Sequence, residues 1–223
     1  EIPLRLVGSE MCIRDRSLCV QRGEAGHGPV IMLYMSENAK QTSSDDKKKD
    51  FRIRPFTAAD YPQMREIYEQ GLNTGHATYE TRSLTFEEFK AGKIMPSVHV
   101  AVEADDDSKV LGWVSAAPVS TRTVFHGVVE DSIYLGAEAQ GRGIGGALLD
   151  RLIEVCQDLH KWAIHSWIFP ENAGSAGLHK SRGFVKVGTY SHMAKMTYGE
   201  LAGQWRDTDV YELLLPKPEE KKR

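Results

Sequence analysis

The hydrophobic positions of this chain change their period several times, and each change marks a predicted element. Apolar and polar residues alternate in FRIRPF near the start of the patterned region, as they do in a half-buried strand. Two later alternating segments flank the acidic turn DDDS at 105–108, which predicts a hairpin. Strands are predicted over 51–56, 97–104, 109–119, about 128–135, 161–169, 184–194 and 206–215.

Helical periodicity accompanies capping residues between these strands. Thr57 is predicted to cap a helix that ends near Gly71, and Thr85 a short helix through 86–94. A further short helix is predicted over 173–182. The strongest helical pattern follows a glycine-rich stretch, and its apolar face is formed by Ile144, Ala147, Leu148, Leu152, Val155, Cys156 and Leu159. The pattern predicts an α/β (α+β) fold with a mixed, mostly antiparallel sheet flanked by helices.

The composition is typical of one globular domain with irregular ends. The chain has 223 residues, of which 41% are hydrophobic and 26% charged. Residues 36–50 contain no large apolar side chain, so they are expected to be disordered. Residues 6–16, LVGSEMCIRDR, resemble a translated sequencing adapter and are expected to be artefactual. The predicted organisation is therefore a leader over 1–50, one domain over 51–215 and a charged tail over 216–223.

Charge and cysteine usage exclude several classes of partner. The formal net charge is −3 and the Lys and Arg residues are scattered, which argues against a nucleic-acid partner. The apolar run at 30–35 is too short to span a bilayer, so no membrane partner is expected. Three cysteines without paired spacing favour a reducing, cytoplasmic location. His126, His160 and His165 show no ligand spacing, and no metal is expected.

The glycine-rich stretch lies between a predicted strand and the strongest predicted helix. Such a turn exposes backbone N–H groups at the positive end of the helix dipole, where a phosphate can bind. The residues Gln140 to Gly145 read Q-x-x-G-x-G, which is neither a Walker loop nor the Rossmann spacing. From the residues alone, the stretch is either a pyrophosphate cradle or a tight connection.

This motif resembles the acetyl-CoA loop of the GNAT acyltransferases. Within that superfamily the chain is similar to the phosphinothricin and methionine sulfoximine N-acetyltransferases. They share VEDSIYL at 129–135, FPENAGSAGLHKSRGF at 169–184 and GQWRDTDVYELLL at 203–215. The segment 192–207 departs from the family by its length. The resemblance covers 51–215 and implies the GNAT fold, acetyl-CoA as co-substrate and a small amino-acid-like acceptor.

The resemblance also implies two catalytic residues. Glu130 matches the family's glutamate, and a carboxylate can take the proton of the acceptor ammonium. Asp131 competes for this role, because adjacent strand residues point to opposite faces and only one can face the acceptor. His179 matches the family's histidine and is expected to protonate the leaving thiolate or assist the amine. A capping or core histidine is the alternative.

Further contacts follow from the same resemblance. The backbone of Ile133, Tyr134 and Leu135 is expected to pair with the pantetheine arm, as an added strand would. The pyrophosphate is expected on Gln140, Gly141, Arg142, Gly143, Ile144, Gly145 and Gly146. Asn172 matches the family's asparagine that touches the pantetheine or adenosine part, although it could equally cap the next helix.

The acceptor side rests on two residues. Tyr79 is expected to line the acceptor site, with a core role as its alternative. Arg122 matches an arginine near the acceptor carboxylate, with a solvated hairpin tip as its alternative. The family commonly forms homodimers, so a homodimer is expected here. Two other functions remain open: acetylation of peptide or protein amines, and a non-catalytic acyl-CoA-binding module.

Overall fold

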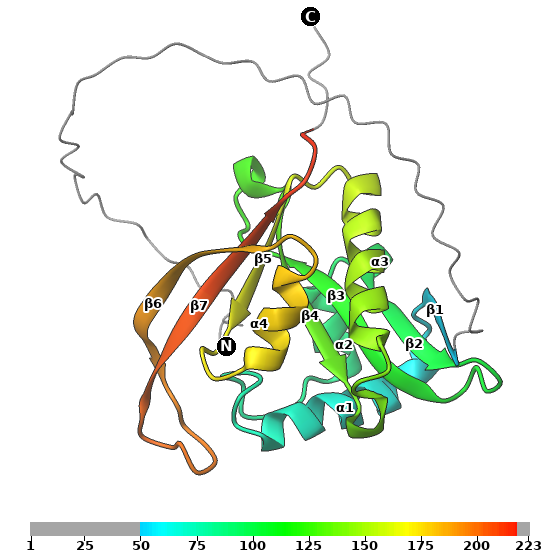
Figure 1. The fold of residues 1–223 in the computed structure, drawn as a ribbon, viewed down its shortest axis with the longest axis horizontal. Coiled ribbons are helices and arrows are strands. Elements are labelled where there is room, and N and C mark those ends of the chain that lie inside the picture. Colours follow the sequence, from blue (N-terminus) through cyan, green and yellow to red (C-terminus); the bar gives the residue numbers. More distant parts are fainter. Residues whose placement is uncertain (1–49, 218–223) are drawn as a thin grey trace, which may run out of the picture. The chain divides into compact units, whose positions relative to one another are not determined.

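The computed structural model describes residues 50–217 (Figure 1). The predicted leader and tail lie outside this range, apart from Asp50, Pro216 and Lys217. One sheet of seven strands runs in the order β1-β2-β3-β4-β5-β7-β6. β4 and β5 pair in parallel and every other pairing is antiparallel, which confirms the predicted mixed sheet. The strands are β1 (Phe51–Pro55), β2 (His99–Glu103), β3 (Val110–Pro118), β4 (Val128–Leu135), β5 (Ala163–Ile168), β6 (Val185–Lys195) and β7 (Trp205–Leu214).

Two pairs of helices cover the two faces of the sheet (Figure 1). α1 (Tyr61–Asn73) and α2 (Phe86–Gly92) cover what we call the α1/α2 face, and α3 (Ile144–Asp158) and α4 (Ala173–Lys180) cover the α3/α4 face. The core on the α1/α2 face includes Met64, Ile67, Phe89, Val100, Val102 and Trp113. The core on the α3/α4 face includes Val114, Val129, Leu148, Leu149, Leu152 and Ile164. Within residues 50–217, no helix has the length and apolar character needed to cross a lipid bilayer.

The first helix begins later than its sequence pattern predicts. Thr57 starts a 3₁₀ turn over Ala58–Asp60, and α1 follows from Tyr61. The turn is fixed by the Asp60 carboxylate, which accepts a 2.7 Å hydrogen bond from the Thr57 N–H and a 2.8 Å hydrogen bond from Arg54. Pro62 then occupies the first turn of α1, where its missing N–H leaves no hydrogen bond unmade.

The second predicted cap is confirmed. The Thr85 hydroxyl accepts a 3.3 Å hydrogen bond from the backbone N–H of Glu88, three residues into α2. The Glu88 carboxylate in turn accepts a 2.7 Å hydrogen bond from the backbone N–H of Thr85. This reciprocal capping box satisfies two N–H groups at the helix start, so a helix of only seven residues has a defined beginning.

β4 and β5 separate soon after they meet. Their register contains three pairs, Val128↔Ala163, Val129↔Ile164 and Glu130↔His165. β4 then continues beside β3 as far as Leu135, while β5 continues beside β7 as far as Ile168. Figure 1 shows the two strands diverging beyond this point. We call the gap between 131–135 of β4 and 166–168 of β5 the fork. Among the described residues, no strand pairs with 131–135 of β4 on the side that faces the fork.

Candidate active site at the fork

β4 presents chemically different side chains to the two faces of the sheet. Val129 and Ile133 pack into the core on the α3/α4 face. Tyr134 faces the opposite side and stacks on Trp113 with ring centroids 4.9 Å apart. Since side chains alternate along a strand, Glu130 shares the α1/α2 face with Tyr134, and Asp131 faces α3 and α4. The two competing carboxylates therefore lie on opposite sides of the sheet.

Glu130 lies beside a partly buried cation. Lys93, which follows α2, donates a 3.0 Å hydrogen bond from Nζ to Oγ of Ser132, two residues beyond Glu130 on the same face. Burial raises the pKa of the Glu130 carboxyl above its usual value, and the charge of Lys93 opposes this rise. Burial also lowers the pKa of the Lys93 ammonium. The site thus combines a more basic carboxylate with a nearby positive charge that favours its ionised form.

His165 is the cross-strand neighbour of Glu130 at the last β4–β5 pair. Its Nε2 lies 3.2 Å from Oε1 of Glu212, which is its register partner on β7. Residues paired across a sheet share a face, so a row of three polar side chains crosses the sheet there. The sequence spacing of the histidines gave no indication of this row, because Glu130, His165 and Glu212 come from three separate strands.

The His179 imidazole is almost completely buried and joins the two strands at the fork. Its side chain is 1% exposed. Nε2 lies 3.0 Å from Oδ2 of Asp131 on β4 and 2.9 Å from Oγ of Ser166 on β5, while Nδ1 lies 2.8 Å from the Ser175 carbonyl. Burial tends to lower the pKa of His179, but the hydrogen bond and charge of Asp131 outweigh it, and the pKa is raised.

The predicted catalytic residues therefore approach the fork from opposite sides. Glu130 reaches it from the α1/α2 face, and His179 reaches it from α4 through a hydrogen-bonded contact with Asp131. They do not share one hydrogen-bond network. The partnership of Asp131 with His179 was missed by the sequence analysis, because the two residues are 48 positions apart and no local pattern connects them.

The glycine-rich loop contains two glycines in a conformation that other residues adopt at a cost. Gly141 and Gly143 have φ values of 76° and 79°, and a Cβ added to either would meet nothing within 4 Å. Gly143 is the N-cap of α3 and provides no side-chain cap, so the first N–H groups of a 15-residue helix face the loop. These features fit an anion such as a pyrophosphate.

The other loop residues differ in what their side chains contact within the described residues. Ile144 is fully buried in the core. A Cβ on Gly145 would lie 3.2 Å from Leu135 and Leu178, and one on Gly146 would overlap the Arg182 guanidinium. Arg142 turns away to form ion pairs of 2.8 Å with Glu103 and with Asp50, and Gln140 is exposed. Ligand contact by this loop would therefore come mainly from its backbone.

The open edge of β4 provides the second feature that fits acetyl-CoA. Ile133, Tyr134 and Leu135 pair with β3 on one side, and their other edge faces the fork. The Ile133 and Leu135 side chains pack on the α3/α4 core, which fixes the backbone in an extended conformation. An amide-containing chain could add to this edge by main-chain hydrogen bonds.

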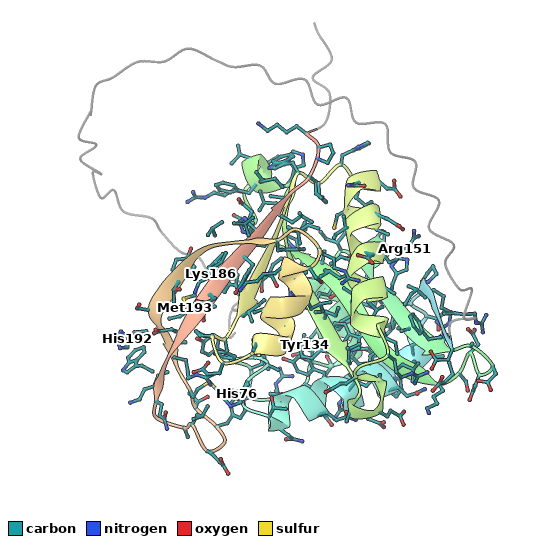
Figure 2. All side chains as sticks on the ribbon, viewed as in Figure 1. His76, Tyr134, Arg151, Lys186, His192 and Met193 are labelled. Atoms are coloured by element: carbon teal, nitrogen blue, oxygen red, sulfur yellow. The ribbon has the colours of Figure 1, made fainter. Side chains whose placement is uncertain are left out.

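Two of the three predicted accessory residues, Asn172 and Tyr79, have defined partners. Asn172 caps α4, accepting a 3.0 Å hydrogen bond from the Ser175 N–H, and also donates a 3.2 Å hydrogen bond to the His76 carbonyl. His76 is labelled below α4 in Figure 2. The Tyr79 hydroxyl lies 2.7 Å from the Thr208 hydroxyl, and its ring meets Phe169 edge-on at 4.7 Å. Arg122 is exposed on the connection between β3 and β4.

A buried arginine organises the end of the sheet near Tyr79. Arg206 on β7 is 5% exposed, and its guanidinium carbon lies 4.0 Å from the centroid of the Phe169 ring. It donates 3.0 Å hydrogen bonds to the Gly75 carbonyl and to the Glu171 carboxylate. The longer segment before β7 is tied to the same region, since the Tyr198 hydroxyl donates a 2.8 Å hydrogen bond to the Thr78 carbonyl. Arg206 belongs to the shared segment 203–215, but the sequence analysis gave it no role.

Two observations bear on metals and thiols. Within residues 50–217, no group of three or more His, Cys, Asp or Glu side chains is arranged to hold a metal ion. Cys156 is free and buried on α3, and its burial, together with the charge of Asp131, raises the pKa of the thiol to about 12. It is therefore a neutral thiol near physiological pH.

Comparisons with known proteins agree with this geometry. The profile of the acetyltransferase (GNAT) family matches residues 61–184. The phosphinothricin N-acetyltransferase of Alcaligenes faecalis is 31% identical over 160 residues, covering 70% of this chain and 78% of that protein. The L-methionine sulfoximine/L-methionine sulfone acetyltransferase of Pseudomonas paraeruginosa is 27% identical over 166 residues, covering 73% of this chain and 94% of that protein.

A solved structure extends the comparison to three dimensions. It is a phosphinothricin acetyltransferase of the GNAT superfamily from Sinorhizobium meliloti, in complex with acetyl-CoA. This chain is similar to it with a TM-score of 0.66 and 30% sequence identity. The match covers 77% of this chain and 95% of that one.

Proposed function

Because this chain belongs to the acetyltransferase (GNAT) family and is an acetyl-CoA-dependent N-acetyltransferase, we propose that its acceptor is a small amino acid of the phosphinothricin or methionine sulfoximine type. The observation that carries the proposal is the fork. It places the open edge of β4 directly after Glu130, so an acyl carrier bound along that edge brings its reactive end to a carboxylate.

Acetyl-CoA supplies an activated acetyl thioester. The backbone N–H groups of the loop 140–146 and the start of α3 bind its pyrophosphate, because the open space above Gly141 and Gly143 allows close approach. The backbone of residues 133–135 pairs with the pantetheine arm, and one N–H from this edge points at the thioester oxygen. Asn172 lies at the start of α4, where it contacts the arm or holds the backbone at His76 in place by its hydrogen bond.

Glu130 acts as the general base. It takes a proton from the acceptor ammonium, directly or through a water molecule, so that the neutral amine can attack. Burial raises its pKa and makes it a better proton acceptor, while the charge of Lys93 limits that rise. The carboxylate is thus more basic than a surface glutamate and is favoured in its ionised form.

His179 acts as the general acid for the thiolate that the transfer releases. Its ring lies between β4 and β5 at the base of the fork, and its raised pKa keeps a proton available. Tyr79 lines the acceptor side, held there by Thr208 and Phe169. Arg122 binds the acceptor carboxylate, since its exposed position leaves the guanidinium free to form two parallel hydrogen bonds.

We also propose a homodimer and a cytoplasmic location. β6 is one of the two edge strands, and large apolar side chains on it and on β7 are exposed: Val185 by 65%, Val187 by 57%, Tyr190 by 39% and Trp205 by 59%. Such an edge is suited to pairing with a second copy. Sedimentation of the native enzyme and of a Val187→Lys variant tests this, with a dimer and a monomer as the expected results. The free thiol of Cys156 is consistent with a reducing compartment.

The acceptor is tested with acetyl-CoA and a panel of amines, following thiol release. The panel holds phosphinothricin, methionine sulfoximine, methionine sulfone, the common amino acids and a set of short peptides with free N-termini and lysines. Acetylation of the sulfoximine and phosphinothricin, with no reaction of the peptides, is the expected result. Reaction of the peptides alone would establish the peptide-amine alternative. Cofactor binding without acetylation of any amine would establish a binding module.

A further inference from the structure

The hydrogen-bond partners of His179 favour a ring that is protonated on both nitrogens, with hydroxyls of Ser166 and Ser175 also near Nε2 and Nδ1. The Ser175 carbonyl can only accept, so the contact at 2.8 Å requires a proton on Nδ1. The Asp131 carboxylate also accepts, so the contact at 3.0 Å places a second proton on Nε2. Ser166 Oγ, 2.9 Å from Nε2, is close enough to share that proton. The arrangement is that of an imidazolium paired with a carboxylate.

The charges that reach this pair come from the other face of the sheet, where Glu130 and Lys93 lie within electrostatic range of Asp131. The two side chains of the pair itself are each 1% exposed. The titratable group that faces it from α3 is the Cys156 thiol, whose pKa of about 12 keeps it neutral. The Phe184 ring meets the imidazole edge-on at 5.0 Å, and Ser166 from β5 is not titratable near neutral pH. Asp131 is thus the charged group that decides the state of His179.

One carboxylate oxygen of Asp131 makes no hydrogen bond to the described residues. This oxygen, Oδ1, is buried. Asp131 is the first residue of β4 beyond its last pair with β5, so this oxygen lies where the fork opens. A buried carboxylate oxygen normally has a donor, so Oδ1 can accept a hydrogen bond from a water molecule or from a ligand group in the fork.

We propose that Asp131 is a positioning residue of the acetyl transfer, which holds His179 as an imidazolium across the base of the fork. The proposal rests on the proposed role of His179 as general acid. Two adjacent residues of β4 then serve two proton transfers from opposite faces: Glu130 receives the proton of the amine, and Asp131 holds in place the group that donates to sulfur. Glu130 passes the ammonium proton to solvent, and the nitrogen loses a second proton to solvent as the new C–N bond becomes an amide. The C–S bond breaks, and the thiolate takes one proton from His179, which regains it from solvent. One proton is released overall, and both residues return to their starting states.

The first test needs no substitution and no substrate. The imidazole ¹⁵N signals of the native enzyme are followed by NMR from pH 5 to pH 9, and the His179 signal is assigned by connecting it to the backbone signals of the same residue. We expect both His179 nitrogens to stay protonated well above the ordinary imidazole value of about 6.5. A neutral His179 ring at pH 7.5 would overturn the proposal, whether or not any variant folds.

The second test separates positioning from structure. In Asp131→Asn we expect the His179 signal to titrate at a lower pH. We also expect kcat to fall by on the order of 100-fold, with its alkaline limb moved to lower pH. The dissociation constant of acetyl-CoA, measured by calorimetry, should stay within about twofold of native, because the loop and the open edge are intact.

Asp60→Asn is the matched control. Asp60 is also a buried carboxylate in an ion pair, with Arg54, on the far side of the sheet from His179. Its loss should lower thermal stability without moving the kcat–pH profile. A shifted His179 titration with an unchanged kcat–pH profile would refute the positioning role while the transferase activity stands. Failure of the native enzyme to acetylate any amine would refute the proposed function, and the NMR result would still report the charge pair.

Discussion

Substitution of Gly143 separates the two physical roles of the glycine-rich loop. With φ of 79°, Gly143 adopts a left-handed conformation, and an added Cβ would meet nothing within 4 Å. Gly143→Ala should therefore strain the backbone without a steric clash. The free energy of unfolding should fall by on the order of 1–2 kcal/mol. For a protein of this size the melting temperature should fall by about 2–4 °C for each kcal/mol. Gly143→Asn should be milder, because asparagine tolerates this conformation.

The two Gly143 substitutions should affect acetyl-CoA binding in a different order from protein stability. Either substitution adds atoms at the N-cap of α3, next to the first N–H groups of the helix, where a pyrophosphate would lie. Losing one charge-assisted hydrogen bond costs about 1.5–3 kcal/mol, which corresponds to about a 10- to 150-fold weaker dissociation constant. We expect Gly143→Asn to weaken acetyl-CoA binding by this amount in calorimetry, although it is the less destabilised variant.

A substrate that lacks the pyrophosphate provides the decisive comparison. S-acetylpantetheine carries the same thioester on the same arm, so its rate should be nearly the same in the native enzyme and in Gly143→Asn. The rate with subsaturating acetyl-CoA should fall in step with binding. If both variants lose only stability and bind acetyl-CoA as tightly as the native enzyme, the loop is a tight connection and not a pyrophosphate cradle.

Three further predictions concern proton transfer and charge. Glu130→Gln should lower kcat by on the order of 100-fold while acetyl-CoA binding in calorimetry is unchanged; equal activity across the pH range would exclude Glu130 as the base. Lys93→Met should move the acid limb of kcat/KM to higher pH, because the charge of Lys93 lowers the pKa of Glu130, and Lys93→Arg should retain the native profile. The pKa of His179 is raised in the folded protein, so its ion pair with Asp131 stabilises the fold fully at pH values below the pKa of an imidazole in the unfolded chain, about 6.5. This stabilisation is lost as the pH rises through the pKa of His179 in the folded protein. Urea unfolding should therefore show a larger cost of Asp131→Asn at pH 6 than at alkaline pH, and a cost that does not change with pH would contradict the charge pair.

The elements of the fold could be predicted because each is encoded by a local pattern. The strand predicted over about 128–135 and the capped helix after Thr85 are confirmed as β4 and α2. The start of the first helix was misplaced because Thr57 is a good cap for a 3₁₀ turn as well as for an α-helix. A capping residue shows that a helical turn begins, and the packing of Asp60 against Arg54 decides which kind follows.

The site could be predicted only as far as its local motifs extend. The glycine loop and the position of Glu130 are readable in sequence, because each belongs to a continuous segment. The pairing of Asp131 with His179 and the placement of Lys93 beside Ser132 depend on contacts over 48 and 39 positions. Such contacts arise from the topology of the sheet and from helix packing, and neither leaves a spacing that can be recognised along the chain.

The short pairing of β4 with β5 has a consequence for how the sheet holds together. It divides the sheet into a four-stranded part, β1 to β4, and a three-stranded part, β5 to β7, joined along their backbones by only three residue pairs. Beyond these three pairs, the two parts are held together by side-chain contacts, such as those of His179 with Asp131 and Ser166, and by packing on α3 and α4. A ligand that pairs with the β4 edge would add main-chain bonds where the sheet lacks them. Binding of such a ligand and the association of the two parts of the sheet are then thermodynamically linked, so that acetyl-CoA should stabilise the sheet against separation between β4 and β5.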